Sequence, residues 1–455
     1  MSGQGSPAPA GYLSLTDADR EAMLGAIGVG SVDALFEQIP DGVRFDRPLD
    51  VPAALPEAAL VRHLEELAAR NADTTRELSF LGMGIYDHYV PAIADTFLSR
   101  GELLTAYTPY QPEMSQGVLQ AIFEYQTAIC ELTGMDVSNA SGYDGTTVAA
   151  DACFIARHHT GRSKVVLAET LNPMVRQVVK TYAPGFGMEV TEVPHDGGTI
   201  DPARFAGEAR DAAIAIFQQP NVFGCLEPAP ELAAAANEGG ALSVAHVDLA
   251  SLGLLEAPGA YGCAMAIGEG QSIGNYQSYG GPHYGFLAAG NEFIRRMPGR
   301  IVGETTDLEG RRGFVLTLQT REQHIRREKA TSNMTTNQTL LALAGLITLC
   351  WLGPAGLREL GETCTALAAY AKERVGLPLA FERPTFKEVA FRTPVDAREV
   401  VARARERGVH PGYPLGRDYE GLDDVLLVAL TEKRTPADVD RLAEVLAEVL
   451  EEVAS

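Results

Sequence analysis

The stretch that decides the fold runs from Asp248 to Gly285 and reads DLASLGLLEAPGAYGCAMAIGEGQSIGNYQSYGGPHYG. It follows an apolar run, Ala241–Val247, which is typical of a buried strand in a parallel sheet. A second apolar run, Cys263–Ile267, predicts another strand that returns to the same edge. Ligands of open α/β sheets bind at the carboxyl ends of the strands. Asp248 is therefore expected to lie where the chemistry takes place.

Strands and helices are expected to alternate before this stretch. From residue 164 onward, apolar runs are separated by amphipathic segments of helical length. This alternation is the signature of a doubly wound α/β sheet. The predicted segments are the strands Lys164–Ala168, Met188–Val193 and Ala213–Gln218, and the helices Asn172–Tyr182, Asp201–Arg210 and Glu227–Gly239.

The stretch resembles a segment of the glycine decarboxylase P-protein, a fold-type I enzyme of pyridoxal phosphate (PLP). In that fold an Asp at one strand end keeps the pyridine nitrogen protonated, and a Lys at another forms the Schiff base. The P-protein lysine lies in the segment His-Lys-Thr-Phe, ahead of a glycine-rich turn and Gly-Pro. When that turn is placed on Gly280-Gly281-Pro282, the lysine position falls on Gln271. The resemblance extends from about Leu13 to Val449.

Gln271 departs from the family pattern because glutamine cannot form an imine. The departure makes the chain similar to the α subunit (subunit 1) of the two-subunit P-protein, whose partner subunit carries the PLP. Alternatively, Gln271 is a polar residue at a strand end that only bonds the local backbone. None of the six lysines lies between Asp248 and Gly285, and only Lys329 is kept as a remote Schiff-base candidate.

Other segments also match P-protein signatures, among them Tyr86-Asp87-His88-Tyr89, Thr108–Glu113 and REQHIRREKATSN from Arg321. Residues 79–117 are rich in Gly, Tyr, Pro, His and Gln without clear periodicity, which is typical of a functional loop. The alternative is that the aromatic residues fill a subunit interface and the arginines form ion pairs between subunits. The resemblance implies that the site is shaped by His88, Tyr107, Tyr110, Gln111, Glu113, Asn139, Ser141, Asn221, Asp248, Arg326 and Asn333.

A loop of mostly small residues, Ser138–Thr147, leads into a predicted helix, Val148–Arg157. Such a loop before a helix N-terminus suits a phosphate group, and fold-type I enzymes bind the PLP phosphate at this place. Tyr143 and Asp144 stand where small residues are expected, and an acidic side chain beside a phosphate is unfavourable. The sequence therefore predicts a degenerate cofactor pocket. His246 is interpreted as a core histidine of its strand.

Charge and composition exclude several classes of partner. The net charge of −23 argues against nucleic acid and anionic membranes. No run approaches about 18 apolar residues, and the start of the chain, MSGQGSPAPAGYLSLTDADR, lacks the features of a secretory signal, so no membrane association is expected. The six cysteines show no CxxC spacing, which favours free thiols and argues against a metal site. We therefore expect a cytoplasmic location.

Three parts are expected along the chain. Residues 1–75 form an N-terminal helical extension, which either clasps a neighbouring subunit or packs on the large domain. Residues 76–345 form a large α/β domain of the fold-type I PLP-dependent transferase kind, with a mostly parallel sheet. Residues 346–455 form a small C-terminal α+β domain.

The resemblance implies one function and leaves two alternatives. As subunit 1 of the P-protein, the chain would act with a PLP-bearing subunit 2, in an expected α2β2 assembly. The assembly would decarboxylate glycine and transfer the aminomethyl group to the lipoyl group of H-protein. No cofactor is expected to be bound covalently by this chain. The alternatives are a non-catalytic scaffold or regulatory subunit of a PLP enzyme, and a self-sufficient PLP decarboxylase that uses another lysine.

Overall fold

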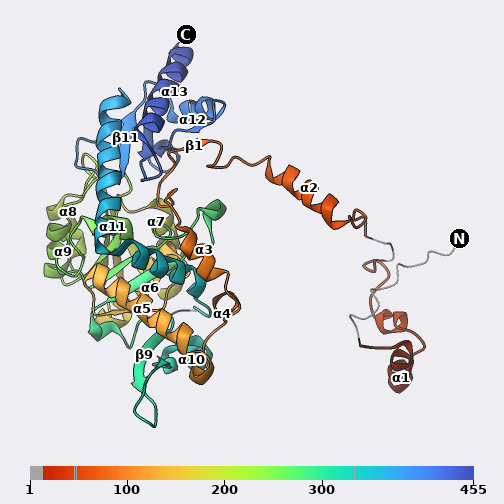
Figure 1. Cartoon of the computed structure of the whole chain (residues 1–455). Coiled ribbons are helices and arrows are strands. Elements are labelled where there is room, and N and C mark those ends of the chain that lie inside the picture. The colour runs from red at the N-terminus through yellow and green to blue at the C-terminus, as the bar shows by residue number, and fades with distance from the viewer. Residues whose placement is uncertain (1–13, 46, 48, 331, 333, 455) are drawn as a thin grey trace. The chain divides into compact units, whose positions relative to one another are not determined.

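The computed structural model describes residues 14–45, 47, 49–330, 332 and 334–454. The chain divides into two compact units, Met1–Asn71 and Ala72–Ser455 (Figure 1). The first unit contains α1 (Asp17–Ile27), the 3-10 helix η1 (Asp33–Phe36) and α2 (Glu57–Ala68). Thr16 and Asp19 form the capping box of α1, and no residue of these three helices is buried.

A seven-stranded sheet forms the centre of the second unit. Its strand order is β2 (Val137–Ser138), β8 (Gly285–Ala289), β7 (Met265–Glu269), β6 (Leu242–Val247), β5 (Ile214–Gln219), β3 (Lys164–Ala168) and β4 (Glu189–Val193). The strands from β4 to β7 pair in parallel, whereas β8 is antiparallel to both of its neighbours. The mostly parallel sheet confirms the predicted α/β fold.

Helices cover both faces of this sheet because its strands are apolar on both sides. One core contains residues of α6 (Gly145–Thr160) and α7 (Pro173–Tyr182). The other core contains residues of α5 (Gln116–Thr133), α8 (Pro202–Ala209), α9 (Ala229–Glu238) and the first half of α11 (Thr339–Arg374). Consecutive residues of one strand point to opposite faces, so Val165 and Val166 of β3 belong to different cores.

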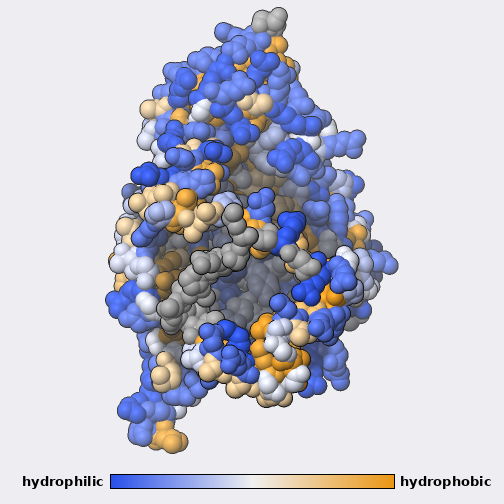
Figure 2. Space-filling model, turned by 90° about the vertical axis from the view of Figure 1, so that its right-hand side faces the viewer, coloured by the Kyte–Doolittle hydropathy of each residue, from blue (hydrophilic) through white to orange (hydrophobic). Residues whose placement is uncertain are grey.

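A smaller α+β layer follows. β11 (Glu388–Arg392), β14 (Val425–Ala429) and β13 (Tyr413–Pro414) form an antiparallel sheet that packs with α12 (Ala397–Arg405), α13 (Pro436–Ala454) and the second half of α11. β1 (Leu78–Ser79) pairs with β12 (Val409–His410), so the start of the second unit joins this layer. Figure 1 shows the layer at the end that carries the C-terminus, and Figure 2 shows that this end is covered mostly by hydrophilic residues.

The helix α11 connects the two layers and bends at Gly353, whose φ of 61° and ψ of −179° are not helical. The expectation that no segment has the length and apolarity of a membrane span was wrong for this helix, which qualifies by length and composition only. A core helix meets the same criterion, and α11 supplies Leu343 to one core of the large sheet and Leu367 to the core of the smaller layer.

A hairpin and three short helices were not predicted. A hairpin of β9 (Ile301–Thr306) and β10 (Arg312–Thr317) interrupts the segment before α11 and packs on α5. The remaining helices of this unit are α3 (Ala92–Leu98), α4 (Gly101–Leu104) and α10 (Gln323–Arg326).

Candidate functional site

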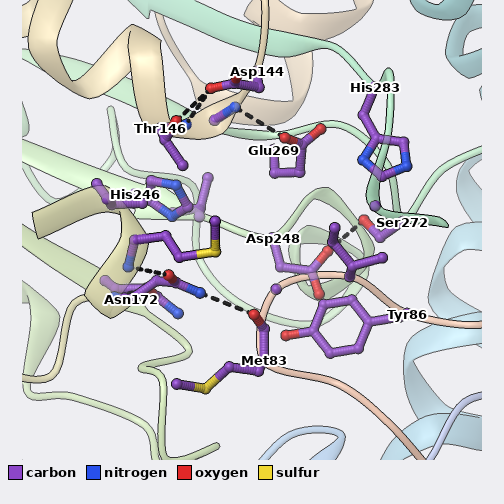
Figure 3. Close-up of a pocket in the computed structure, with 18 of the residues that line it drawn as sticks. Met83, Tyr86, Asp144, Thr146, Asn172, His246, Asp248, Glu269, Ser272 and His283 are labelled. Atoms are coloured by element: carbon purple, nitrogen blue, oxygen red, sulfur yellow. Dashed lines mark hydrogen bonds between the residues drawn. The ribbon is translucent and has the colours of Figure 1, made fainter. Parts of the chain in front are cut away.

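A cavity of about 450 Å³ lies where the parallel strands β6 and β7 end. Asp248 follows β6 and Glu269 closes β7, so both carboxylates lie at the expected edge of the sheet (Figure 3). The N-termini of α6 and α7, the segment 83–86, the turn 280–283 and residues 386–388 complete the wall. Asn172 holds one part of this wall in place, because its Nδ2 donates a hydrogen bond to the Met83 carbonyl at 2.9 Å.

Asp248 is paired with a lysine of the small layer. Oδ2 of Asp248 lies 2.5 Å from Nζ of Lys387, whose side chain is only 3% exposed. Oδ1 accepts a hydrogen bond from the Ser272 hydroxyl at 2.6 Å. Burial acts to raise the pKa of Asp248, but the charge of Lys387 and the hydrogen bonds from Lys387 and Ser272 outweigh it, and the pKa is lowered. The carboxylate is therefore ionised and compensated within the chain.

His88 forms a hydrogen bond with the lysine of this pair. Its Nε2 lies 2.8 Å from Nζ of Lys387, and its Nδ1 lies 2.6 Å from Oε2 of Glu432. An ammonium group can only donate, so Nε2 accepts and Nδ1 carries the proton that is donated to Glu432. Burial opposes ionisation of Glu432, but His88 lowers its pKa to about 2. The side chains of Glu432, neutral His88 and Lys387 thus form a continuous chain of charge-assisted hydrogen bonds that ends at Asp248.

Gln271 is fully buried, and its side-chain amide bonds the backbone of a distant segment. Its Oε1 accepts from the Tyr86 N–H at 2.8 Å, and its Nε2 donates to the carbonyls of Tyr86 and Asn275 at 2.8 and 2.9 Å. Gln271 therefore positions Tyr86, whose ring forms part of the cavity wall. The Nζ of Lys387 lies 3.4 Å from the centre of that ring, and the Tyr86 hydroxyl donates to Glu388 at 2.9 Å.

Carboxylates occupy the N-terminus of α6. Asp144 caps the helix and accepts hydrogen bonds from the N–H groups of Thr146 and Thr147 at 2.9 and 2.8 Å. Oε2 of Glu269 accepts from the Gly145 N–H at 2.9 Å. A Cβ at residue 145 would lie 2.7–2.9 Å from the Glu269 backbone and Cβ, so this close approach requires glycine. The donors that the resemblance assigns to a phosphate are thus already used.

Burial shifts the pKa of several groups around the cavity. It raises the pKa of Glu269 to about 8 and that of Glu388 to about 7. It lowers the pKa of His246 to about 4, so this ring is neutral. His246 is 8% exposed and lines the cavity, so its interpretation as a core histidine was incomplete.

The structure places most of the other predicted site residues outside the cavity wall. Tyr107, Tyr110, Gln111, Glu113 and Arg326 are exposed, and Asn333 lies outside the described residues. The Tyr110 ring lies 5.6 Å from the Arg300 guanidinium and packs on His324.

Three of the predicted residues hold loops together. Asn139 Nδ2 donates to the Pro298 carbonyl at 3.2 Å, and the Ser141 hydroxyl accepts from Asn337 Nδ2 at 3.0 Å. Asn221 accepts from the N–H groups of Phe223 and Cys225 and donates to Glu227. The Asn221 side chain is buried in its own turn and therefore does not reach the cavity.

The lysine in the cavity is Lys387, and the choice of Lys329 as the remote candidate was wrong. Lys329 is exposed, whereas Lys387 lies beside Asp248. Lys387 and Glu388 are charged residues directly before and at the start of a strand whose next three residues are apolar, which is the signal that could have found them. The resemblance identifies only positions that match the family motif, and this segment was not among them.

One group of side chains among the described residues could be close enough to hold a metal ion: His88, Cys364 and Glu432, whose ligand atoms lie within 4.8 Å of one another. The ammonium of Lys387 lies 2.8 Å from His88 Nε2 and would repel a cation there. This group is therefore better suited to its charged hydrogen bonds than to a metal.

The fold and the position of Asp248 define a PLP-transferase-like α/β protein. The model of the family "Glycine cleavage system P-protein" matches residues 10–446. The chain is 48% identical to a probable glycine dehydrogenase (decarboxylating) subunit 1 of Geotalea uraniireducens, over 96% of this chain and 99% of that protein. The chain belongs to the glycine cleavage system P-protein family.

Solved structures agree with this assignment. An inhibitor-bound glycine decarboxylase (P-protein) of the glycine cleavage system is 41% identical, with a TM-score of 0.86, covering 96% of this chain and 100% of that one. A sphingosine-1-phosphate lyase of Burkholderia pseudomallei shares the fold, with 18% identity and a TM-score of 0.63, covering 91% of this chain and 94% of that one. These relatives are consistent with PLP as a cofactor of the assembled enzyme.

Proposed function

We propose that this chain is subunit 1 of the decarboxylating glycine dehydrogenase of the glycine cleavage system, and that it binds no PLP of its own. The name shared by the subunit 1 relatives supports the first part and implies a subunit 2. In the proposal, a lysine-bearing subunit 2 holds the PLP, and the assembly decarboxylates glycine and transfers the aminomethyl group to lipoylated H-protein.

The observation that carries the second part is that the three anchoring points for the cofactor are already occupied. Lys387 takes the carboxylate of Asp248 that would hold the pyridine nitrogen. Asp144 and Glu269 take the helix N–H groups that would hold the phosphate. Gln271 stands at the Schiff-base position, and its amide is bonded to the Tyr86 and Asn275 backbone. The residues of this chain therefore do not fit PLP.

In this proposal, the chain contributes side chains and surfaces to a site on its partner. Segments that match the family carry exposed side chains that are available to another subunit: Tyr107, Tyr110, Gln111, Glu113 and Arg326. The α2β2 stoichiometry, the cytoplasmic location and the contact with H-protein belong to the same proposal. Light scattering of the mixed subunits measures the stoichiometry.

Reconstitution tests the proposal. The purified chain is incubated with PLP, its visible spectrum is recorded, and it is then mixed with subunit 2 and lipoylated H-protein for an assay of glycine-dependent carbon dioxide exchange. We expect no lysine-bound PLP absorbance from this chain alone and activity only after mixing. Such absorbance in the lone chain would overturn the proposed absence of PLP.

Alanine variants of Tyr110 and Arg326 distinguish a contribution to the partner's site from a purely non-catalytic scaffold role. Both side chains are exposed, so their loss should leave the chain folded. A contribution to the partner's site predicts lower turnover with the complex still assembled. Unchanged turnover, or a partner equally active without this chain, would favour the scaffold. His88 is a poor choice for this test because its loss would break the buried chain of charge-assisted hydrogen bonds.

A further inference from the structure

We propose that the cavity at the ends of β6 and β7 binds a small molecule carrying a protonated primary amine on a short apolar body, without a carboxylate. Glu269 and His246 would hold the amine. The inference concerns this chain's own cavity and does not depend on the activity of the assembled enzyme.

In the described part of the cavity wall, two buried polar atoms have neither a hydrogen-bond nor an ion-pair partner, whereas Asp248 Oδ2 is held by Lys387. Oε2 of Glu269 accepts the Gly145 N–H, but Oε1 has no partner. The ring of His246 hydrogen-bonds the backbone of Gly145, and its Nε2 has none. Figure 3 shows both side chains at the same cavity. Unpaired buried polar atoms are costly, so these two atoms indicate a missing partner.

Both atoms are suited to accept hydrogen bonds. A carboxylate accepts through both oxygens, and a neutral imidazole has one accepting nitrogen. His246 is neutral because it is buried. A ligand that satisfies both must donate at least two hydrogen bonds from one group. An ammonium group has three donors and a positive charge that suits Glu269.

The charges of the wall select against anions. Four carboxylates line the cavity, from Asp144, Asp248, Glu269 and Glu388. Among the described lining residues there is no arginine, and the one lysine, Lys387, is already paired with Asp248. A phosphate or a carboxylate would thus meet the ionised members of this set, such as Asp248, without a free cation. An amino acid would satisfy the acceptors with its amine but leave its own carboxylate unpaired.

Apolar side chains in the cavity wall suit a ligand with an apolar body. Met83, Ile85, Val175 and Phe386 line the cavity together with the acceptors. A cavity of about 450 Å³ holds a small organic molecule, within the range of ligand pockets. A short alkyl chain attached to the amine would contact these side chains.

Isothermal titration calorimetry of the full chain with n-butylamine tests the inference, with butyrate, inorganic phosphate and glycine as comparison ligands. We expect saturable binding of n-butylamine, at least about tenfold weaker binding of glycine, and no binding of butyrate or phosphate. The Glu269→Gln variant should weaken n-butylamine binding at least about tenfold. The Glu256→Gln variant, at an exposed glutamate, should bind as the parent does.

A second variant, Met174→Trp, tests the inference even if Glu269→Gln does not fold. Met174 lines the cavity but is 65% exposed, so Met174→Trp should fill the cavity without disturbing the core. It should abolish n-butylamine binding while the circular dichroism spectrum is unchanged. The inference is overturned by absence of saturable n-butylamine binding, by unchanged binding in both variants, or by glycine, butyrate or phosphate binding as tightly as the amine.

The pH gives an independent readout. The groups facing Glu269 are Asp144, His246, Tyr125 and Tyr284, and in the free protein its carboxyl has a raised pKa of about 8. A bound ammonium favours the ionised form, so n-butylamine should bind more tightly at pH 8 than at pH 6 and release protons on binding. This pH dependence should be lost in Glu269→Gln. Equal affinity at the two pH values in the parent would contradict the assigned contact.

Discussion

Lys387 places its Nζ 2.5 Å from Oδ2 of Asp248 and brings a residue of the small layer into the centre of the large one. In fold-type I enzymes the corresponding Asp faces a protonated pyridine nitrogen. Here the lysine ammonium supplies the positive charge at that position. The Asp248 carboxylate is thus neutralised by a buried lysine of its own chain.

The first prediction concerns this ion pair. Lys387→Met leaves the Asp248 carboxylate buried without its cation, so we expect the free energy of unfolding to fall by about 3–5 kcal/mol. Urea denaturation followed by circular dichroism measures the change. The double variant Lys387→Met/Asp248→Asn removes both charges and should recover a large part of the loss.

Lys180 offers the matched control for that experiment. Its Nζ lies 2.9 Å from Glu192, but its side chain is 50% exposed. Lys180→Met should cost less than about 1 kcal/mol because water screens the pair. Equal losses from Lys387→Met and Lys180→Met would show that the Lys387 pair is not the buried pair described above.

The second prediction is that a lysine at the Schiff-base position does not restore PLP binding. Gln271→Lys supplies the amine, but Asp248 remains paired with Lys387 and the N-terminus of α6 remains filled by Asp144 and Glu269. After incubation with PLP, the variant should show no visible absorbance of a lysine-bound cofactor. Subunit 2 under the same conditions is the positive control.

A fold check completes this test, because the variant also loses the amide bonds to Tyr86. Gln271→Met loses the same bonds without adding an amine, so it gives the stability that the bonds contribute, and Gln271→Lys should lose at least as much because it also buries an amine. Appearance of the cofactor absorbance in Gln271→Lys alone would mean that the three occupied anchoring points are not what excludes PLP.

The sequence predicts the architecture well because hydrophobic period and length determine it locally. β3 has the predicted bounds, and the first residues of β4 and of the strand before Asp248 each differ by one from the prediction. The hairpin β9–β10 was missed because apolar and polar residues are mixed in its strands, which read IVGETT and RGFVLT and are partly exposed. In this hairpin the apolar alternation that identifies a strand is weak.

The cavity could be predicted only in part. Asp248 was found because its strand end is visible in the local pattern. Lys387 was missed because its contact with Asp248 depends on how the small layer packs on the large one, which no local pattern encodes. Glu269 was overlooked for a related reason: it is the last residue of β7, and its importance appears only when the N-terminus of α6 is placed beside it.

The third prediction concerns stability against pH. Burial raises the pKa of Glu269 to about 8 in the folded chain, against about 4.5 in the unfolded one. Between these values the folded state binds the extra proton, so stability is full below about pH 4.5 and falls as pH rises to about 8. Glu269→Gln should remove this contribution, up to about 1.4 kcal/mol per pH unit.

Urea denaturation of the parent and of Glu269→Gln at pH 5, 6, 7 and 8 checks this prediction. The difference between the two chains isolates Glu269 from Glu388 and Asp151, whose pKa values are also raised, to about 7. Glu256→Gln should follow the parent. A stability difference that does not change between pH 5 and pH 8 would contradict the raised pKa of Glu269.

The last prediction concerns the bend of α11. Gly353 has φ 61° and ψ −179°, a conformation that is essentially restricted to glycine, and a Cβ there would meet no atom within 4 Å. Gly353→Ala should therefore lower the free energy of unfolding by about 1–3 kcal/mol through backbone strain alone.

Gly356 lies in the same helix without a positive φ, and its Cβ would contact only the Leu352 side chain at 3.3 Å. Gly356→Ala should be neutral or stabilise by up to about 1 kcal/mol, because alanine favours a helix. Thermal unfolding of the two variants separates the effects, and equal Tm changes would show that the bend does not depend on the conformation of Gly353.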